Sequence, residues 1–124
     1  MKKKPTILVV EDEDVLIELL RGALDHEGFT VMTVQDGADA IKMYASNVAN
    51  IDVVLTDMGL PSRGGWEVLA EVRKINPDAK VICASGFLEN SIREEMIAAG
   101  AVEFIQKPYV YAELVSLIRS LLPE

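Results

Sequence analysis

Apolar residues along this chain follow two alternating patterns. Short runs of mostly apolar residues, typical of buried strands, lie at 6–10, 29–34, 51–56, 80–84 and 102–105. In the stretches that follow, apolar residues recur every three or four positions, as in amphipathic helices, at 15–26, 38–47, 65–75, 90–99 and 111–122. Five strands that alternate with five helices predict an α/β fold in which helices cover both faces of a parallel sheet.

Turn and capping residues support this division. Gly28 and Gly100 follow two of the helical stretches, in the position where glycine commonly ends a helix. Asp36 precedes the stretch at 38–47 and is a favourable N-cap. Because the sequence contains no repeat, linker or low-complexity segment, we expect a single domain over residues 1–124.

Composition narrows the classes of function. The 124 residues include 20 acidic and 12 basic side chains, a formal net charge of -8. Direct binding of nucleic acid needs clustered Lys and Arg, which this chain lacks. No apolar run approaches the length of a transmembrane helix, and a single cysteine, Cys83, permits no intrachain disulfide. We therefore expect a cytoplasmic protein with no direct contact to nucleic acid and no membrane insertion.

Chemistry-bearing side chains follow four of the five predicted strands: Glu11 and Asp12, Asp57, Ser85, and Lys107. The carboxyl ends of parallel strands meet at one edge of a sheet, where ligands bind, so we expect these side chains to converge. Taken singly, an aspartate after a strand is also a common turn residue, and acids such as those at 11–14 commonly begin a helix. Their expected convergence favours a functional site.

Three carboxylates that converge need positive charge nearby. Two unit charges about 4 Å apart interact by about 4 kcal/mol at an effective dielectric constant of about 20. Lys107 supplies one positive charge, and a divalent cation is the natural source of the rest. Hard oxygen ligands favour Mg²⁺ or Mn²⁺, and a bound Mg²⁺ is typically completed by phosphate oxygens. The pattern therefore predicts a metal-assisted phosphoryl site in which the Asp57 carboxylate can be the nucleophile.

Four segments carry a resemblance to a known family. LVVEDE, LTDMGLP, CASG and FIQKP, in this order and spacing, resemble the receiver domain of two-component response regulators, over the whole chain. The resemblance implies a flavodoxin-like, doubly wound sheet with strand order 2-1-3-4-5. It also implies a phosphorylation switch without turnover of a separate substrate. The switch would control a protein partner through the face formed by the fourth helix, the fifth strand and the fifth helix.

The resemblance further implies a phosphoacceptor and a set of metal ligands. Asp57 would accept a phosphoryl group from a phosphohistidine on a sensor histidine kinase or a histidine phosphotransfer protein. Mg²⁺ would be held by Glu11, Asp12, Asp57 and the backbone carbonyl of Gly59. Glu11 stands where aspartate is more frequent, and its longer side chain should still reach the metal.

Other roles follow from the same resemblance. Ser85, in a position where threonine is commonest, and Lys107 would bind the phosphoryl group. Phe104 would be the aromatic residue whose rotamer follows phosphorylation. The bond between Lys107 and Pro108 matches one that is usually cis in this family.

Two positions predict slow loss of the phosphoryl group. Gly59 lies two residues beyond Asp57, where many relatives carry a polar side chain that can orient the hydrolytic water. Phe87 lies two residues beyond Ser85 and is large enough to shield the phosphoryl group. We therefore expect self-dephosphorylation to be slow compared with relatives that carry an amide or acid at the position of Gly59.

Three alternatives compete with this interpretation. A degenerate receiver that signals by contact alone would not need the complete set of acids, serine and lysine. A phosphatase with an aspartyl nucleophile needs a substrate cap and a second acid near the nucleophile, where this chain has Gly59. In a flavin-binding protein of similar topology, the acidic edge would repel the flavin phosphate. The sequence is compatible both with a stand-alone regulator and with a receiver taken from a hybrid histidine kinase.

Overall fold

The computed structural model describes residues 4–59, 64–86 and 90–123, without the side chains of residues 90–92. All ten predicted elements are present with the predicted type, and each boundary lies within two residues of its expected position. The strands are β1 (Thr6–Val10), β2 (Thr30–Val34), β3 (Val53–Asp57), β4 (Val81–Ser85) and β5 (Glu103–Gln106). The helices are α1 (Asp14–His26), α2 (Gly37–Ser46), α3 (Gly65–Ile75), α4 (Asn90–Ala98) and α5 (Tyr111–Leu121).

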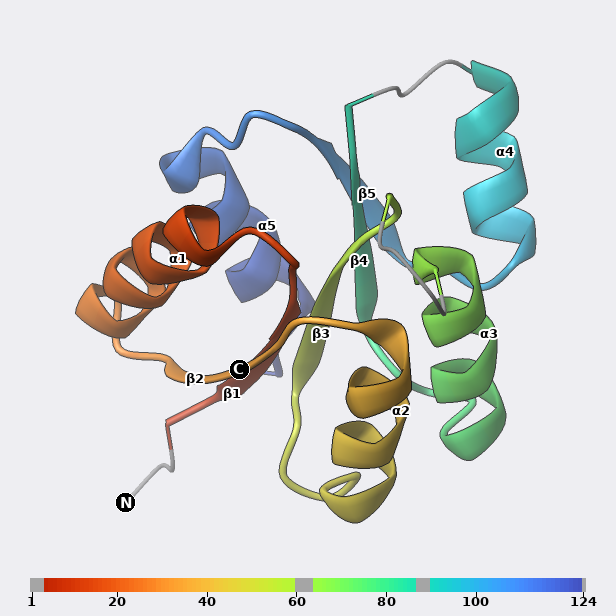
Figure 1. Ribbon diagram of the computed structural model, residues 1–124, viewed down its shortest axis with the longest axis horizontal. Coiled ribbons are helices and arrows are strands. Elements are labelled where there is room, and N and C mark those ends of the chain that lie inside the picture. The colour runs from red at the N-terminus through yellow and green to blue at the C-terminus, as the bar shows by residue number, and fades with distance from the viewer. Residues whose placement is uncertain (1–3, 60–63, 87–89, 124) are drawn as a thin grey trace.

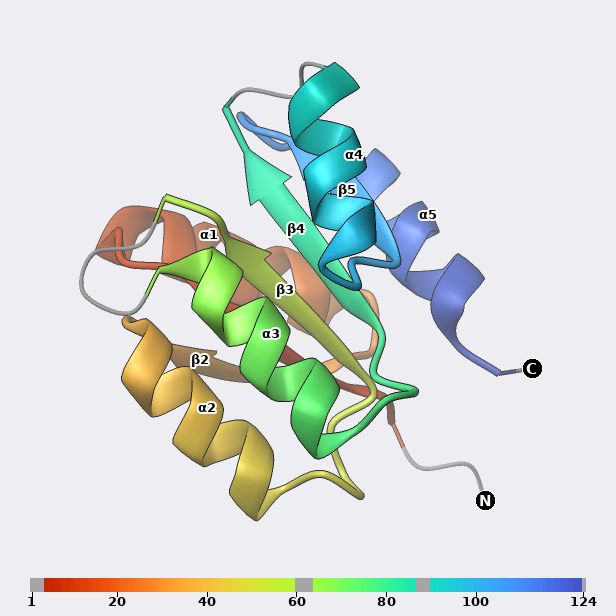
Figure 2. The same ribbon diagram turned by 90° about the vertical axis from the view of Figure 1, so that its right-hand side faces the viewer.

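The strands form one parallel sheet of order β2-β1-β3-β4-β5. Figure 1 shows helices on both faces of this sheet, with α1 and α5 on one face and α2, α3 and α4 on the other. Figure 2 shows α2, α3 and α4 side by side on their face. The predicted α/β class and the strand order 2-1-3-4-5 are both confirmed.

Each face of the sheet packs an apolar cluster against its helices. Leu8 and Val10 of β1 join the cluster under α2, α3 and α4, whereas Ile7 and Val9 join the cluster under α1 and α5. Successive side chains of a strand point to opposite faces, so a strand covered on both sides must be apolar throughout. This packing explains why β1 and β3 appear in the sequence as continuous apolar runs.

The predicted caps have the expected backbone. Gly28 and Gly100 have φ of +94° and +105°, a region that favours glycine after a helix. The side chain of Asp36 caps α2 by accepting a hydrogen bond of 2.8 Å from the Asp39 N–H. Glu13 is the N-cap residue of α1 without a side-chain capping bond, and its N–H donates instead to Glu11, in the site described below.

Two residues named or quoted in the sequence analysis lie outside the described part of the chain: Pro61, the last residue of LTDMGLP, and Phe87, with its expected shielding role. The bond between Lys107 and Pro108 is cis, as the resemblance implied. The longest described helix, α1, has 13 residues, and none of the described helices is long and apolar enough to cross a membrane.

Candidate functional site

The sheet register brings the predicted residues to one edge. Asp57 is the last residue of β3 and pairs with Ala84, so Ser85, the last residue of β4, extends one position beyond that pair. Ser85 in turn pairs with Gln106, the last residue of β5. The Lys107 N–H then donates to the Ser85 carbonyl at 2.9 Å, which fixes the start of the segment that carries the lysine.

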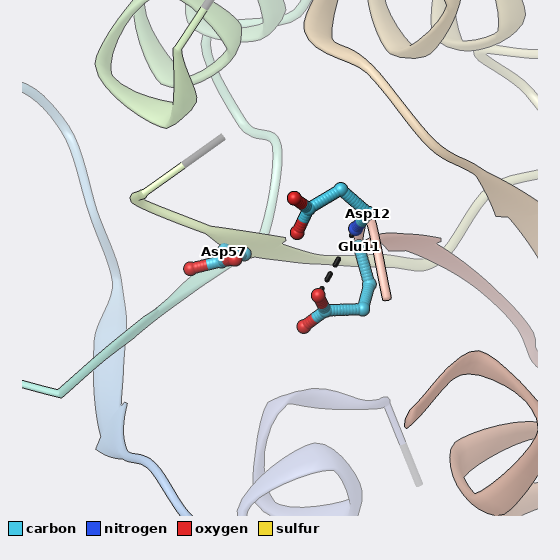
Figure 3. A group of neighbouring side chains, drawn as sticks. All are labelled: Glu11, Asp12 and Asp57. Carbon is cyan, nitrogen blue, oxygen red and sulfur yellow. Dashed lines mark hydrogen bonds between the residues drawn. The ribbon is translucent and has the colours of Figure 1, made fainter. Parts of the chain in front are cut away.

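Three carboxylates form the centre of this edge. One oxygen from each of Glu11, Asp12 and Asp57 lies within 4.8 Å of the others. Figure 3 shows the three side chains at the ends of β1 and β3, with the Asp57 carboxylate pointing beyond the end of its strand. Glu11 and Asp57 are buried, at 1% and 7% exposure, while Asp12 is exposed. The cluster is therefore open to solvent on the Asp12 side.

Lys107 is the cation that reaches this cluster. Its Nζ lies 3.1 Å from Glu11 Oε1 and 3.4 Å from Asp57 Oδ2, and its side chain is 20% exposed. Burial alone lowers the pKa of Lys107, but the hydrogen bond to Glu11 and the charges of Asp57 and Glu11 outweigh it and leave the pKa raised. The lysine therefore stays protonated next to both acids.

Glu11 uses both carboxylate oxygens. Oε2 accepts hydrogen bonds from the backbone N–H groups of Asp12 and Glu13, at 3.0 and 3.1 Å, and Oε1 accepts the bond from Lys107. Desolvation nevertheless raises the pKa of Glu11, against the lowering effect of the Glu13 N–H and of Lys107. Glu11 is thus both the more heavily hydrogen-bonded acid and the nearer partner of Lys107.

The backbone around Asp57 is tightly built. Asp57 Oδ1 accepts a hydrogen bond of 3.0 Å from the Gly59 N–H. At the start of α3, Gly65 approaches so closely that a Cβ atom there would lie 2.4 Å from the Asp57 carbonyl oxygen and 2.6 Å from the Cα of Met58. Only glycine fits this contact, which brings α3 against the end of β3. Sequence reasoning missed Gly65, and its only signal is the glycine pair at 64–65.

Two aromatic residues complete the surroundings. Phe104 is half-buried on β5, where it pairs with Cys83 and packs against the apolar cluster under α2, α3 and α4. Tyr109 lies with Lys107 in a groove between α1 and the start of α5. Burial raises the pKa of Tyr109, and the charges of Glu11 and Asp57 raise it further, so its hydroxyl stays neutral. No pattern in the sequence had indicated this position for Tyr109.

The donor set fits a hard divalent cation. The three carboxylates are oxygen ligands, one of them exposed to solvent, and Lys107 alone balances one of their three charges. Two negative charges remain among these four groups, which a divalent cation would neutralise. Among the described residues, this is the one group of three or more acids, histidines or cysteines close enough to hold a metal. The expectation of an acidic, metal-compatible cluster is thus confirmed.

Comparisons with known proteins agree with this geometry. Residues 7–119 match the family model described as the response regulator receiver domain. The chain is 31% identical over 117 residues to the sensor kinase CckA of Brucella abortus, covering 94% of this chain and 12% of CckA. It is 36% identical over 119 residues to the transcriptional regulatory protein PrrA of Mycobacterium tuberculosis, covering 95% of this chain and 50% of PrrA. The chain thus spans half or less of these two relatives.

A solved structure gives the same result. The response regulator protein TrrA of Thermotoga maritima, in complex with Mg²⁺ and BeF, superposes with a TM-score of 0.85 at 34% identity, over 95% of this chain and 99% of TrrA. The fold, the acidic cluster and the match over residues 7–119 lead to one assignment. The chain belongs to the response regulator receiver domain family, whose members are signalling switches of two-component systems.

Proposed function

We propose that this chain is a phosphorelay receiver in which Asp57 accepts a phosphoryl group from a phosphohistidine. The donor is a sensor histidine kinase or a histidine phosphotransfer protein. One observation carries the proposal: three carboxylates from two neighbouring strands lie within 4.8 Å of one another, and a single lysine contacts two of them. Well-packed apolar residues at this edge would often be at least as stable, so the cluster is best explained by the chemistry that it supports.

The transfer needs few protein groups. An Asp57 carboxylate oxygen forms a bond to phosphorus while the bond between phosphorus and the donor imidazole nitrogen breaks, and the imidazole leaves. Lys107 already lies 3.4 Å from Asp57 Oδ2 and so can pair with a phosphoryl oxygen. The Ser85 hydroxyl, at the end of the neighbouring strand, donates a hydrogen bond to another phosphoryl oxygen. These groups assist both gain and loss of the phosphoryl group, without turnover of a separate substrate.

The acidic cluster is the proposed metal site. Glu11, Asp12, Asp57 and the backbone carbonyl of Gly59 would hold Mg²⁺, or Mn²⁺ in its place. The bound ion supplies the positive charge that offsets the carboxylates and the phosphoryl oxygens. In support, TrrA, at 34% identity, was crystallised with Mg²⁺ and BeF. Glu11 accepts three hydrogen bonds and Asp57 accepts two, so Asp57 has more remaining capacity for the metal than Glu11.

The surface beside the site suits a protein donor. Val15 and Leu19 of α1 are 73% and 54% exposed, and they line one groove together with Lys107, Tyr109 and Tyr111. Exposed apolar side chains next to a reactive group commonly mark a protein contact. We propose that the donor protein covers these residues while its phosphohistidine approaches Asp57.

The output of the switch is also a protein contact. On phosphorylation, the end of β4 that carries Ser85 moves toward the phosphoryl group, and Phe104 turns inward. The face formed by α4, β5 and α5 then changes shape and controls a downstream protein. We further propose that residues 1–124 act as one domain and that the exchange takes place in the cytoplasm.

The test is a mass measurement. The protein is incubated with Mg²⁺ and a small acyl phosphate, and its intact mass is compared with those of Asp57→Ala and Asp12→Asn. We expect a phosphoryl adduct to form in the wild type with Mg²⁺. It should not form without Mg²⁺ or in Asp57→Ala, and it should form more slowly in Asp12→Asn. A matched control, Asp39→Asn, changes an exposed acid of α2 outside the cluster and should leave the adduct unchanged.

Two outcomes would contradict the proposal. An adduct that persists in Asp57→Ala would mean that another residue accepts the group. No adduct with any donor, while Mg²⁺ still binds, would favour the alternative of a receiver that signals by contact alone.

A further inference from the structure

The backbone at the start of α1 fixes the carboxylate of Glu11. Oε2 of Glu11 accepts hydrogen bonds from the N–H groups of Asp12 and Glu13, at 3.0 and 3.1 Å, and Figure 3 shows the first of these bonds. An ionised carboxylate offers about four lone-pair positions, and the bond from Lys107 occupies a further one, on Oε1. The side chain is 1% exposed, so water does not compete for these bonds. Glu11 is therefore a rigid acceptor with most of its capacity in use.

Lys107 depends on such an acceptor for the position of its charge. A lysine side chain is a flexible chain that ends in a point charge, and it has no fixed geometry of its own. The bond from Lys107 Nζ to Glu11 Oε1 is 3.1 Å long, and the bond to Asp57 Oδ2 is longer, at 3.4 Å. At 20% exposure the lysine is not enclosed, so the ammonium could turn toward solvent if Glu11 did not hold it.

The same bond can persist through phosphoryl transfer. An ammonium group has one N–H donor more than the bonds to Glu11 and Asp57 use, and that donor can reach a phosphoryl oxygen. When Asp57 becomes an acyl phosphate, the contact between Asp57 and Lys107 can pass to the phosphoryl group. The bond to Glu11 does not have to change, because Glu11 takes no part in the covalent step.

We propose that Glu11 is a positioning residue for Lys107, which it holds beside Asp57 before transfer and beside the phosphoryl group after transfer. This inference rests on the proposed function, in which Lys107 pairs with a phosphoryl oxygen. It gives Glu11 a role in addition to metal binding, and saturating Mg²⁺ cannot replace that role. A charged group that is already in position does not have to be ordered in the transition state. Without Glu11, transfer should therefore be slower.

The first experiment separates this role from metal binding. Glu11→Gln keeps the length of the side chain, but its single oxygen cannot serve both the backbone N–H groups and Lys107. Adduct formation with a small acyl phosphate is followed by intact mass at increasing Mg²⁺, until more Mg²⁺ no longer raises the rate. We expect this limiting rate to be about tenfold lower in Glu11→Gln than in the wild type. A residue that acts only through the metal would lose rate only at low Mg²⁺.

A double-mutant cycle tests whether the effect depends on the lysine. In a Lys107→Met background, Glu11→Gln should cause no further loss of the limiting rate, because the group that it positions is gone. Glu27→Gln is the matched control. Glu27 Oε1 also lies 3.1 Å from a cation, Arg119 Nη2, but at the other end of α1 from the cluster. The limiting rate of Glu27→Gln should equal that of the wild type.

Nitrogen NMR gives a readout that does not depend on the rate. An ammonium group held by hydrogen bonds exchanges its protons with water slowly, so the Lys107 Nζ signal should be visible in the wild type and lost in Glu11→Gln. The wild type alone also tests the proposal. A scalar coupling across the hydrogen bond, between Lys107 Nζ and the Glu11 carboxyl carbon, should be present in the free protein. It should also be present with beryllofluoride and Mg²⁺, a mimic of the phosphoryl group.

The failures are distinguishable. A limiting rate of Glu11→Gln equal to that of the wild type, the same loss in the Lys107→Met background, or absence of the coupling in either state would overturn the role of Glu11. Each of these results would leave the proposed function intact. If the wild type forms no adduct with Mg²⁺, the proposed function fails, and the role of Glu11 in transfer fails with it, whatever the ammonium signal shows.

Discussion

Two ion pairs in this molecule have the same length and different surroundings. Lys107 Nζ lies 3.1 Å from Glu11 Oε1 at the carboxyl edge of the sheet, and Arg119 Nη2 lies 3.1 Å from Glu27 Oε1 on the surface. The Glu11 side chain is 1% exposed, whereas that of Glu27 is 40% exposed. Exposed pairs are worth about 0–1 kcal/mol, but removing one partner of a buried pair costs about 3–5 kcal/mol. The two ion pairs therefore differ in their expected effect on stability because of burial and not because of distance.

The difference between the two pairs shows where function, rather than stability, explains a buried charge. The Arg119 pair joins α5 to the turn after α1, where water screens both charges. The Lys107 pair lies among acids at the end of an apolar sheet, where well-packed hydrophobic residues would often be at least as stable. The buried pair is thus best understood through the chemistry of Asp57.

The largest expected effect comes from removing each cation in turn. Lys107→Met should lower the free energy of unfolding by about 3 kcal/mol, because Glu11 and Asp57 lose their counter-charge in a buried place. Arg119→Met should lower it by about 1 kcal/mol or less. Urea unfolding at neutral pH, with the denaturant slope checked for constancy, measures both.

Added Mg²⁺ sharpens this test. Mg²⁺ should raise the urea midpoint of unfolding more for Lys107→Met than for the wild type. A cation that binds only the folded cluster stabilises the folded protein by mass action. Equal losses in the two variants would show that burial does not distinguish the pairs.

The residues of the buried pair could be predicted from the sequence, whereas the contacts of their close neighbours could not. Glu11, Asp57 and Lys107 each end or follow a strand, and parallel strands bring such positions together whatever the detailed packing. The close contact of Gly65 depends on where α3 lies against the sheet, which no local pattern encodes. Position along the chain predicted the chemistry, and only packing revealed what supports it.

Strand boundaries differ for a similar reason. The apolar run predicts a third strand from residue 51, but the Ile51 N–H donates to the Asn47 carbonyl at the end of α2, so β3 begins at Val53. At the other end, Asp57 still pairs with Ala84 and belongs to the strand. Hydrophobicity predicts which residues are buried, whereas hydrogen bonding decides where an element begins and ends.

The second prediction compares two glycines. Gly65→Ala should destabilise the protein by about 2 kcal/mol, since the new Cβ would lie 2.4 Å from the Asp57 carbonyl oxygen. Gly22→Ala, within α1, should stabilise it by about 0.5–1 kcal/mol, because a Cβ there meets nothing within 4 Å and alanine favours a helix. Thermal and urea unfolding check the opposite signs. A neutral Gly65→Ala would mean that α3 shifts freely from the site.

The third prediction concerns a buried ionisable group without a counter-charge. Burial raises the pKa of Cys83 to about 12. The folded thiol stays protonated, while the unfolded thiol ionises above its ordinary pKa of about 8.5–9. Its contribution to stability is therefore complete below that pH and is lost as the pH rises. When the free energy of unfolding is measured at pH 7 and at pH 10, the wild type should lose about 1.5 kcal/mol between them relative to Cys83→Ala. Parallel pH profiles would contradict this expectation.

The smallest expected effect, about 1 kcal/mol in an activation free energy, tests whether an exposed position can still control the chemistry. Gly59 is exposed, yet a Cβ there would lie 3.6 Å from Asp57 Oδ1, an ordinary contact, so a side chain can be added without strain. In Gly59→Asn the amide can orient water toward the phosphoryl group and should speed its loss about threefold to tenfold. The decay of the phosphoryl adduct, followed by intact mass, measures the rate. Gly59→Ala adds the same Cβ without a polar group and should decay like the wild type. If both variants lose the phosphoryl group equally faster than the wild type, the backbone and not a water-orienting side chain controls the rate. If neither variant loses it faster, the slow loss expected from glycine at this position has another cause.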